Sequence, residues 1–306
     1  MSLGSDAPTA TVLVGLVNPG DSIHVLLRAL EDQSGSVPLE VVVANRCGSA
    51  LGSEVRERHP GVVVIEAEPE ATLPELRLLA LRGSRGRYVF VTEDHTVPPR
   101  DWIACFVRAL EGAPPRVAAV GGLVDNAMRD RATDWAAFFC EYHGYLPPRS
   151  GGETHDVPGM NVAYRREVLE SADPARLAEG FWETTLHPQL LERGGTFLLL
   201  PEVVMAHRKH FPFAYFLSQR FHYSRYYAGR RFAREERLRR AAFALGSILL
   251  PPLVVGRIAR SVAERPAYRA ALLRSFPALC CFSLAWWVGE CAGYLFGPGR
   301  SLVRIE

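Results

Sequence analysis

The first part of the chain alternates short apolar runs with stretches in which apolar residues recur at helical spacing. The first run ends at the turn signal Asn18-Pro19-Gly20, and Ile23, Leu26 and Leu30 then follow at the spacing of one helix face. Short, mainly apolar runs are typical of buried parallel strands, and they occur at residues 11–17, 39–44, 62–65 and 88–92. The pattern predicts an α/β fold with a doubly wound, mainly parallel sheet and flanking helices.

Chemistry is expected where the strand at 88–92 ends, because ligands bind beyond the carboxyl ends of the strands in such sheets. The residues at that point are Glu93-Asp94-His95. Carboxylate oxygens suit Mg²⁺ or Mn²⁺, and an imidazole is tolerated better by Mn²⁺. The sequence therefore indicates a site for a divalent cation that could face a diphosphate. The alternative is a capped turn with solvated acids.

The pattern changes after residue 212. Residues 213–240 form a basic, aromatic-rich segment, in which eight arginines lie between residues 219 and 240. Hydrophobic segments follow at about 241–255 and 276–296; Pro251-Pro252 interrupts the first and Glu290 the second. An arginine-rich stretch between them would have to cross the bilayer if both spanned it, against the positive-inside tendency. We expect a membrane-associated helical hairpin over residues 241–306, re-entrant or interfacial.

Composition and charge exclude some classes of function. The chain is 48% hydrophobic and 22% charged, which fits a globular protein with a sizeable core, and its formal net charge of +2 disfavours a nucleic-acid binder. Lys209 is the only lysine, so the excess of arginine is first explained by coding bias in a GC-rich genome. The six cysteines form no CxxC pair, which favours a reduced compartment, and the first ten residues show no pattern of a cleaved signal peptide.

Four motifs occur in the order seen in one enzyme family. They are Thr92-Glu93-Asp94-His95 after a strand, Pro158-Gly159-Met160-Asn161, Gly180-Phe181-Trp182-Glu183, and the strand-like Pro201–His207 segment. Over residues 11 to about 232 the chain resembles the family 2 glycosyltransferases of the GT-A fold. In this resemblance Glu93 and His95 stand at the two Asp positions of the family's DxD motif, giving a Glu-Asp-His variant.

The resemblance implies a role for each matched residue. Glu183 is the candidate catalytic base, because Thr184 stands where the family's usual Asp would be; the alternative for Glu183 is an acid favoured at a helix N-terminus. His207 is the candidate metal ligand from the last strand, and His210 competes for that role. The implied metal ligands are Asp94, His95 and His207. The implied donor-binding residues are Asn45, Arg77, Glu93 and Asp94, although Arg77 could equally be a surface salt-bridge residue. The implied acceptor-binding residues are Gly159, Met160, Asn161 and Trp182.

The implied activity is an inverting, hexosyltransferase-type transfer of a sugar from a nucleotide-diphosphate donor, with Mn²⁺ or Mg²⁺ as cofactor. The catalytic domain would cover residues 1–212, with a nucleotide-sugar half of about 1–125 and an acceptor half of about 126–212. The hydrophobic C-terminal helices favour a lipid-linked acceptor, a place on the cytoplasmic face of the cell membrane, and a role in a bacterial cell-envelope glycan.

Two other functions remain open at this stage. Asn45 and Thr184 replace acids of the family pattern, which would fit a membrane-tethered, catalytically degenerate binding module. A nucleotidyltransferase on a similar sheet would need a Gly-rich phosphate loop after the first strand, and the chain offers only Asn18-Pro19-Gly20 there.

Overall fold

The structure is a computed structural model that describes residues 7–33, 35, 37–233 and 236–306. The chain divides into two compact units. Unit 1 comprises Met1–Asp125 and Tyr145–Arg208, and unit 2 comprises Asn126–Gly144 and Lys209–Glu306. The sequence analysis placed residues 126–144 in the acceptor half of the catalytic domain, whereas the structure groups them with the C-terminal helices.

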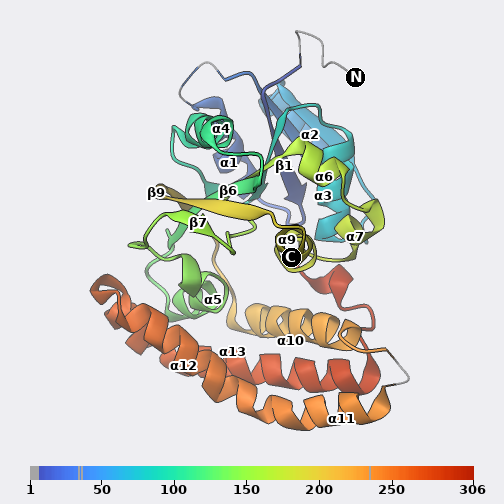
Figure 1. Cartoon of the computed structure of the whole chain (residues 1–306), viewed down its shortest axis with the longest axis vertical. Coiled ribbons are helices and arrows are strands. Elements are labelled where there is room, and N and C mark those ends of the chain that lie inside the picture. Colours follow the sequence, from blue (N-terminus) through green and yellow to red (C-terminus); the bar gives the residue numbers. More distant parts are fainter. Residues whose placement is uncertain (1–6, 34, 36, 234–235) are drawn as a thin grey trace. The chain divides into compact units, whose positions relative to one another are not determined.

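Unit 1 is built on a nine-stranded sheet within the described residues, in the order β3-β2-β1-β4-β8-β6-β9-β5, with β7 paired to β9 (Figure 1). Strands β1 to β4 form a parallel half, with β1 beside both β2 and β4. Strand β8 runs antiparallel to β4 and β6, and β9 runs antiparallel to β5 and β7. The strands are β1 (Ala10–Leu16), β2 (Leu39–Asn45), β3 (Val62–Glu66), β4 (Tyr88–Glu93), β5 (Thr96–Val97), β6 (Val117–Asn126), β7 (Gly152–Thr154), β8 (Val162–Arg165) and β9 (Thr196–His207).

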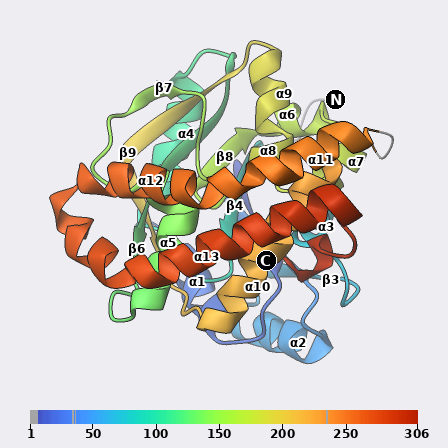
Figure 2. The same cartoon turned by 90° about the horizontal axis from the view of Figure 1, so that it is seen from below.

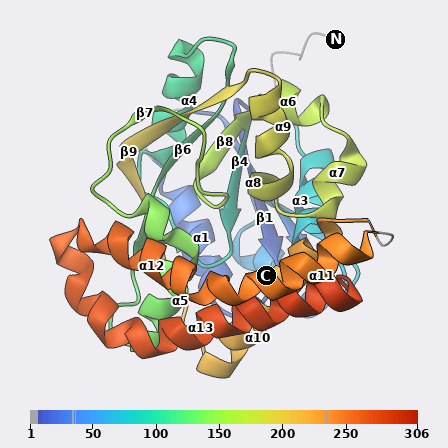
Figure 3. The same ribbon diagram turned by 60° about the horizontal axis from the view of Figure 1, so that its bottom comes forward.

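Helices connect these strands and cover the sheet. Helix α3 begins with a capping box in which Thr72 and Glu75 satisfy each other's backbone N–H groups, and Pro74 occupies its first turn. Helix α1 buries Ile23, Leu26 and Leu30. The helices of unit 1 are α1 (Ser22–Glu31), α2 (Ser49–Arg58), α3 (Leu73–Arg82), α4 (Trp102–Gly112), α6 (Arg166–Glu170), α7 (Pro174–Glu179), α8 (Trp182–Thr185) and α9 (His187–Glu192). In Figure 3, α3, α7 and α8 lie close to one another.

The α/β fold class with a doubly wound, mainly parallel first half is confirmed, and the remainder of the sheet adds antiparallel strands. Strand β6 continues through Gly121 and Gly122. A Cβ at Gly121 would lie 2.5 Å from Cβ of Val157, and one at Gly122 would lie 2.2 Å from the Val203 carbonyl oxygen. These glycines allow close approach of neighbouring backbone inside the sheet instead of ending the strand.

Unit 2 is helical. Helix α10 (Phe213–Arg230) packs along α13 (Arg269–Phe296), and α5 (Ala132–Tyr142) also contacts α13. A Cβ at Gly289 would lie 2.0 Å from Ser224 Oγ, so this glycine permits the close approach of α10 and α13. Figure 2 shows α11 (Arg237–Gly246) and α12 (Leu250–Ala263) running beside α13. Short 3₁₀ turns occur at His143–Tyr145, Ser247–Leu249, Pro266–Tyr268 and Leu302–Arg304.

Two helical stretches in unit 2 are long and apolar enough to cross a membrane, Arg237–Ala263 and Pro266–Phe296, a criterion of length and composition only. Pro251 and Pro252 lie in the first turn of α12, where their missing N–H groups cost little, so they do not interrupt the helical stretch as the sequence suggested. Large apolar side chains are exposed on these helices, among them Leu238, Leu245, Leu253, Leu273 and Phe296.

Candidate functional site

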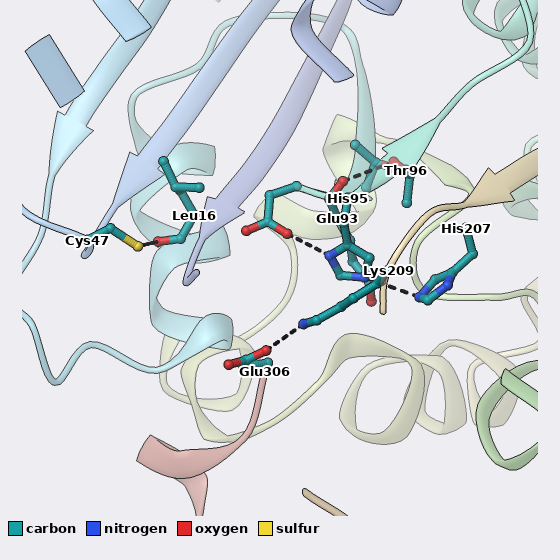
Figure 4. A network of polar contacts seen from close by, with 10 residues as sticks. Leu16, Cys47, Glu93, His95, Thr96, His207, Lys209 and Glu306 are labelled. Carbon is teal, nitrogen blue, oxygen red and sulfur yellow. Dashed lines mark hydrogen bonds and ion pairs between the residues drawn. The ribbon is translucent and has the colours of Figure 1, made fainter. Parts of the chain in front are cut away.

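A cluster of one carboxylate and two imidazoles lies where β4 ends. Glu93 is the last residue of β4, and a short turn leads into β5, whose Thr96 pairs with His207 at the end of β9. Nε2 of His95 lies 3.2 Å from Oε2 of Glu93 and 3.2 Å from Nε2 of His207. Figure 4 shows His95 between the other two side chains. The pairing of β5 with β9 therefore brings together residues that are 112 positions apart.

Asp94 orients the central imidazole. Its Oδ1 lies 2.6 Å from Nδ1 of His95, so that ring nitrogen carries the proton and donates it to the carboxylate. A protonated His95 also carries a hydrogen on Nε2 and donates it to Glu93, and loss of that proton leaves an Nε2 lone pair that points toward Glu93 and His207. Burial opposes ionisation of Glu93, but hydrogen bonding and charge from His95, helped by His207 and Arg77, outweigh it and bring its pKa to about 2. Glu93 is therefore anionic at neutral pH.

The three groups fit a divalent cation. Ligand atoms of Glu93, His95 and His207 all lie within 4.8 Å of one another. Two imidazole nitrogens with one carboxylate oxygen suit Mn²⁺ or Zn²⁺ better than Mg²⁺, which prefers oxygen. The resemblance implied Asp94 as a metal ligand and both Glu93 and Asp94 as donor-binding residues. In the structure Glu93 belongs to the cluster, and Asp94 hydrogen-bonds the other ring nitrogen of His95.

A second carboxylate, Glu183, lies in the short helix α8 and packs against the backbone at Gly159. A Cβ added at Gly159 would lie 2.4 Å from Oε2 and 2.8 Å from Oε1 of Glu183. Any larger residue at position 159 would therefore displace this carboxylate. The Gly159 turn and Glu183, which the sequence assigned to the acceptor and to proton transfer, lie together.

Arg77 links Glu183 electrostatically to the rest of the site. Its guanidinium is buried, lies 3.5 Å from Oε2 of Glu183 and stacks over the Phe181 ring at 5.5 Å. Burial raises the pKa of Glu183; Arg77 partly offsets this, while the charges of Glu93 and Asp156 raise it further. A carboxylate with a raised pKa is a stronger base than an exposed one, which is the property that proton abstraction near neutral pH requires. The alternative for Arg77, a surface salt bridge, does not describe a side chain that is 1% exposed.

Asn161 has no exposed surface, and protein groups satisfy its amide. Its Oδ1 accepts from the Trp102 indole at 2.8 Å, and its Nδ2 donates to the carbonyls of Leu123 at 2.8 Å and Val203 at 3.2 Å. Asn161 thus ties the Gly159 turn to α4, β6 and β9. We therefore assign Asn161 a structural role and not direct contact with an acceptor.

We expect Asn161→Ala to lower the free energy of unfolding by about 1–3 kcal/mol, because it strands a buried indole N–H and two buried carbonyls. Urea denaturation followed by circular dichroism measures this change. An unaltered denaturation midpoint would contradict the structural role of Asn161.

Three other residues singled out by sequence are also buried. Asn45, at the end of β2, donates to the Gly48 carbonyl and to Glu66, and accepts from the Cys47 N–H. The Trp182 indole donates to the Leu177 carbonyl, and Met160 is buried. The Asn45 amide and the Trp182 indole are therefore satisfied by protein groups inside unit 1.

A tyrosine and a carboxylate near Glu183 were not among the residues predicted from the sequence. Tyr145 hydrogen-bonds Asp156, and the charges of Asp156 and Glu183 act on each other and on Tyr145. Asp156 lies three residues before Gly159, in the loop that follows β7. The short distance in sequence between Asp156 and the Pro158-Gly159 motif is the feature from which its place in the site could have been predicted.

No protein-family model matches the chain, and comparison with curated protein sequences gives no match. Solved structures do match. The mannosyltransferase PcManGT from Pyrobaculum calidifontis, solved in complex with GDP-Man and Mn²⁺, is 21% identical, with a TM-score of 0.54 over 94% of this chain and 88% of that one.

GalNAc-T7, solved with UDP, GalNAc and Mn²⁺, is 15% identical, with a TM-score of 0.51 over 66% of this chain. The matched part spans 44% of the GalNAc-T7 chain. At these identities the likeness shows the fold, which is of the GT-A type that the sequence motifs predicted.

Proposed function

We propose that this chain is a metal-dependent glycosyltransferase, similar to family 2, that transfers a hexose from a nucleotide-diphosphate donor with inversion at the anomeric carbon. The observation that carries the proposal is the Glu93, His95 and His207 cluster at the carboxyl end of β4 in a GT-A-type sheet. Structural neighbours of this fold were solved with a nucleotide or nucleotide sugar and Mn²⁺, which supports the same ligand class here.

The chain's own groups divide the work. Glu93, His95 and His207 would hold Mn²⁺, which when bound neutralises charge on the departing diphosphate. Glu183 accepts the proton of the acceptor hydroxyl as that oxygen attacks the anomeric carbon from the face opposite the leaving group. The absence of a side chain at Gly159 leaves room for the Glu183 carboxylate, and the buried Arg77 guanidinium forms an ion pair with it.

The acceptor in this proposal is lipid-linked and is used at the cytoplasmic face of a cell membrane, in synthesis of a bacterial cell-envelope glycan. Unit 2 supports this part, because its long helices expose apolar side chains and the 213–240 segment is rich in arginine. Basic residues near an anionic membrane surface contribute about 1 kcal/mol each to its binding.

A donor panel tests the proposal. Purified full-length chain is mixed with UDP-, GDP- or dTDP-sugars, with and without Mn²⁺, and its thermal unfolding is followed. We expect one nucleotide class to raise Tm by several degrees, and only with Mn²⁺, since a ligand that binds the native state stabilises it by mass action.

The other outcomes of the panel contradict specific parts of the proposal. Stabilisation that does not depend on Mn²⁺ would remove Glu93, His95 and His207 from a metal role. Stabilisation by free nucleoside triphosphates instead of sugars would favour a nucleotidyltransferase. An unchanged Tm with every donor would contradict the binding of a nucleotide sugar.

A further inference from the structure

A second group of histidines and carboxylates lies between helices α1 and α2, separate from the Glu93 cluster. Ligand atoms of Asp21, His24 and Glu54 all lie within 4.8 Å of one another. His24 has no exposed surface, whereas Asp21 and Glu54 face solvent. The group therefore has one buried anchor and two accessible oxygen donors.

A chain of hydrogen bonds fixes the buried ring. Nδ1 of His59 lies 2.6 Å from Oε1 of Glu31, and since a carboxylate only accepts, this nitrogen carries a proton. In a neutral His59 the Nε2 atom is then an acceptor, and Nδ1 of His24, 3.1 Å away, must donate to it. The remaining nitrogen, Nε2 of His24, is left as a lone pair.

That lone pair faces an anion. Nε2 of His24 lies 3.2 Å from Oε1 of Glu54 and has no hydrogen-bond partner among the described residues. Asp21 precedes α1 without making a side-chain capping hydrogen bond, so its carboxylate is available to the same point.

We propose that Asp21, His24 and Glu54 form a second divalent-cation site that fastens α1 to α2. Nε2 of His24 and one oxygen from each carboxylate are the protein ligands, and water completes the shell. One imidazole and two carboxylates suit Zn²⁺ or another transition-series divalent cation better than Ca²⁺. The His59–Glu31 pair behind His24 is the outer support that metal-binding histidines commonly have.

One neighbouring charge opposes binding. Arg58 donates to Oε1 of Glu54 at 2.8 Å, and both side chains are largely exposed. A cation at the site would have to displace this guanidinium or use the other oxygen of Glu54. Removing the guanidinium should therefore strengthen binding, a gain that a purely structural ion pair would not give.

The test is calorimetric titration of the full-length chain with Zn²⁺, together with its Zn²⁺-dependent thermal unfolding. We expect the native chain to bind one more Zn²⁺ than the Asp21→Asn/Glu54→Gln variant, whose changes lie on the surface and leave the core intact. Glu31→Gln should weaken binding at this site about 10- to 100-fold, and Arg58→Gln should tighten it. Glu57→Gln, an exposed acid on the same helix, is the matched control.

The comparison between variants separates this site from the Glu93 cluster, because the variants leave that cluster untouched. Its result therefore does not depend on whether the chain transfers sugars. Equal Zn²⁺ stoichiometry and equal Zn²⁺-induced rises in Tm for the native chain and the double variant would overturn the proposal. So would weaker binding by Arg58→Gln.

Discussion

Glu183→Gln should reduce turnover about 10²- to 10⁴-fold, the usual contribution of a positioned general base. Affinity for the nucleotide sugar should stay near that of the native chain, because glutamine keeps the shape of the side chain and, although it removes the charge that faces Arg77, leaves the Glu93, His95 and His207 cluster in place. Release of nucleoside diphosphate measures turnover, and calorimetry measures donor binding. Glu192→Gln, an exposed acid on α9, is the matched control and should leave both unchanged.

The pH profile gives a second readout of the same residue. Burial raises the pKa of Glu183, so the carboxylate becomes protonated, and inactive as a base, at a higher pH than an ordinary glutamate. Native activity should therefore fall as the pH drops through this raised pKa, and Glu183→Gln should lack that acidic limb. Full turnover in a folded Glu183→Gln variant would remove Glu183 from the catalytic role.

His95→Ala and His207→Ala should each abolish the response to Mn²⁺, with an apparent metal affinity reduced by more than about 100-fold. Each change removes one of three groups that converge within 4.8 Å. Asp94→Asn should have a smaller effect of about 10- to 100-fold, since it alters only the partner that sets the His95 tautomer. The Mn²⁺ dependence of turnover and of the donor-induced rise in Tm measures these changes.

The order of these effects separates ligands from supporting residues. An exposed histidine, His155, provides the control, and His155→Ala should keep the native Mn²⁺ response. A larger loss of apparent Mn²⁺ affinity in Asp94→Asn than in His207→Ala would contradict the assignment of Glu93, His95 and His207 as the metal ligands. Unchanged Mn²⁺ dependence in His207→Ala would contradict the cluster itself.

The sequence predicted the parallel half of the sheet because β1, β2 and β4 are short runs of mainly apolar residues, and the half-exposed β3 is also apolar from Val62 to Ile65. It could not predict the register between β5 and β9, which sets Thr96 opposite His207 and so creates the metal cluster. Long-range antiparallel pairing leaves no periodic trace near either residue. The choice of His207 over His210 therefore rested on resemblance, whereas in the structure His210 lies beside Asp134 in unit 2.

The sequence also could not show that the side-chain amides of Asn45 and Asn161 are buried. Asn45 and Asn161 are polar residues near strand ends, which is also what ligand-binding residues look like in a sequence. The structure shows that their amides satisfy buried protein groups. Nor does the spacing of Glu93, Asp94 and His95 reveal which carboxylate faces His207, because that depends on how the turn between β4 and β5 directs each side chain.

Glycosyl transfer is tested by the release of nucleoside diphosphate by the full-length chain on vesicles that contain polyprenyl phosphate and a total membrane-lipid extract. The donor is the nucleotide sugar that stabilises the chain, supplied with Mn²⁺ or with a chelator. We expect release by the native chain with Mn²⁺, and loss of that release with the chelator or in Glu183→Gln. Donor binding with release no faster than that of Glu183→Gln would contradict this expectation and would favour a binding module.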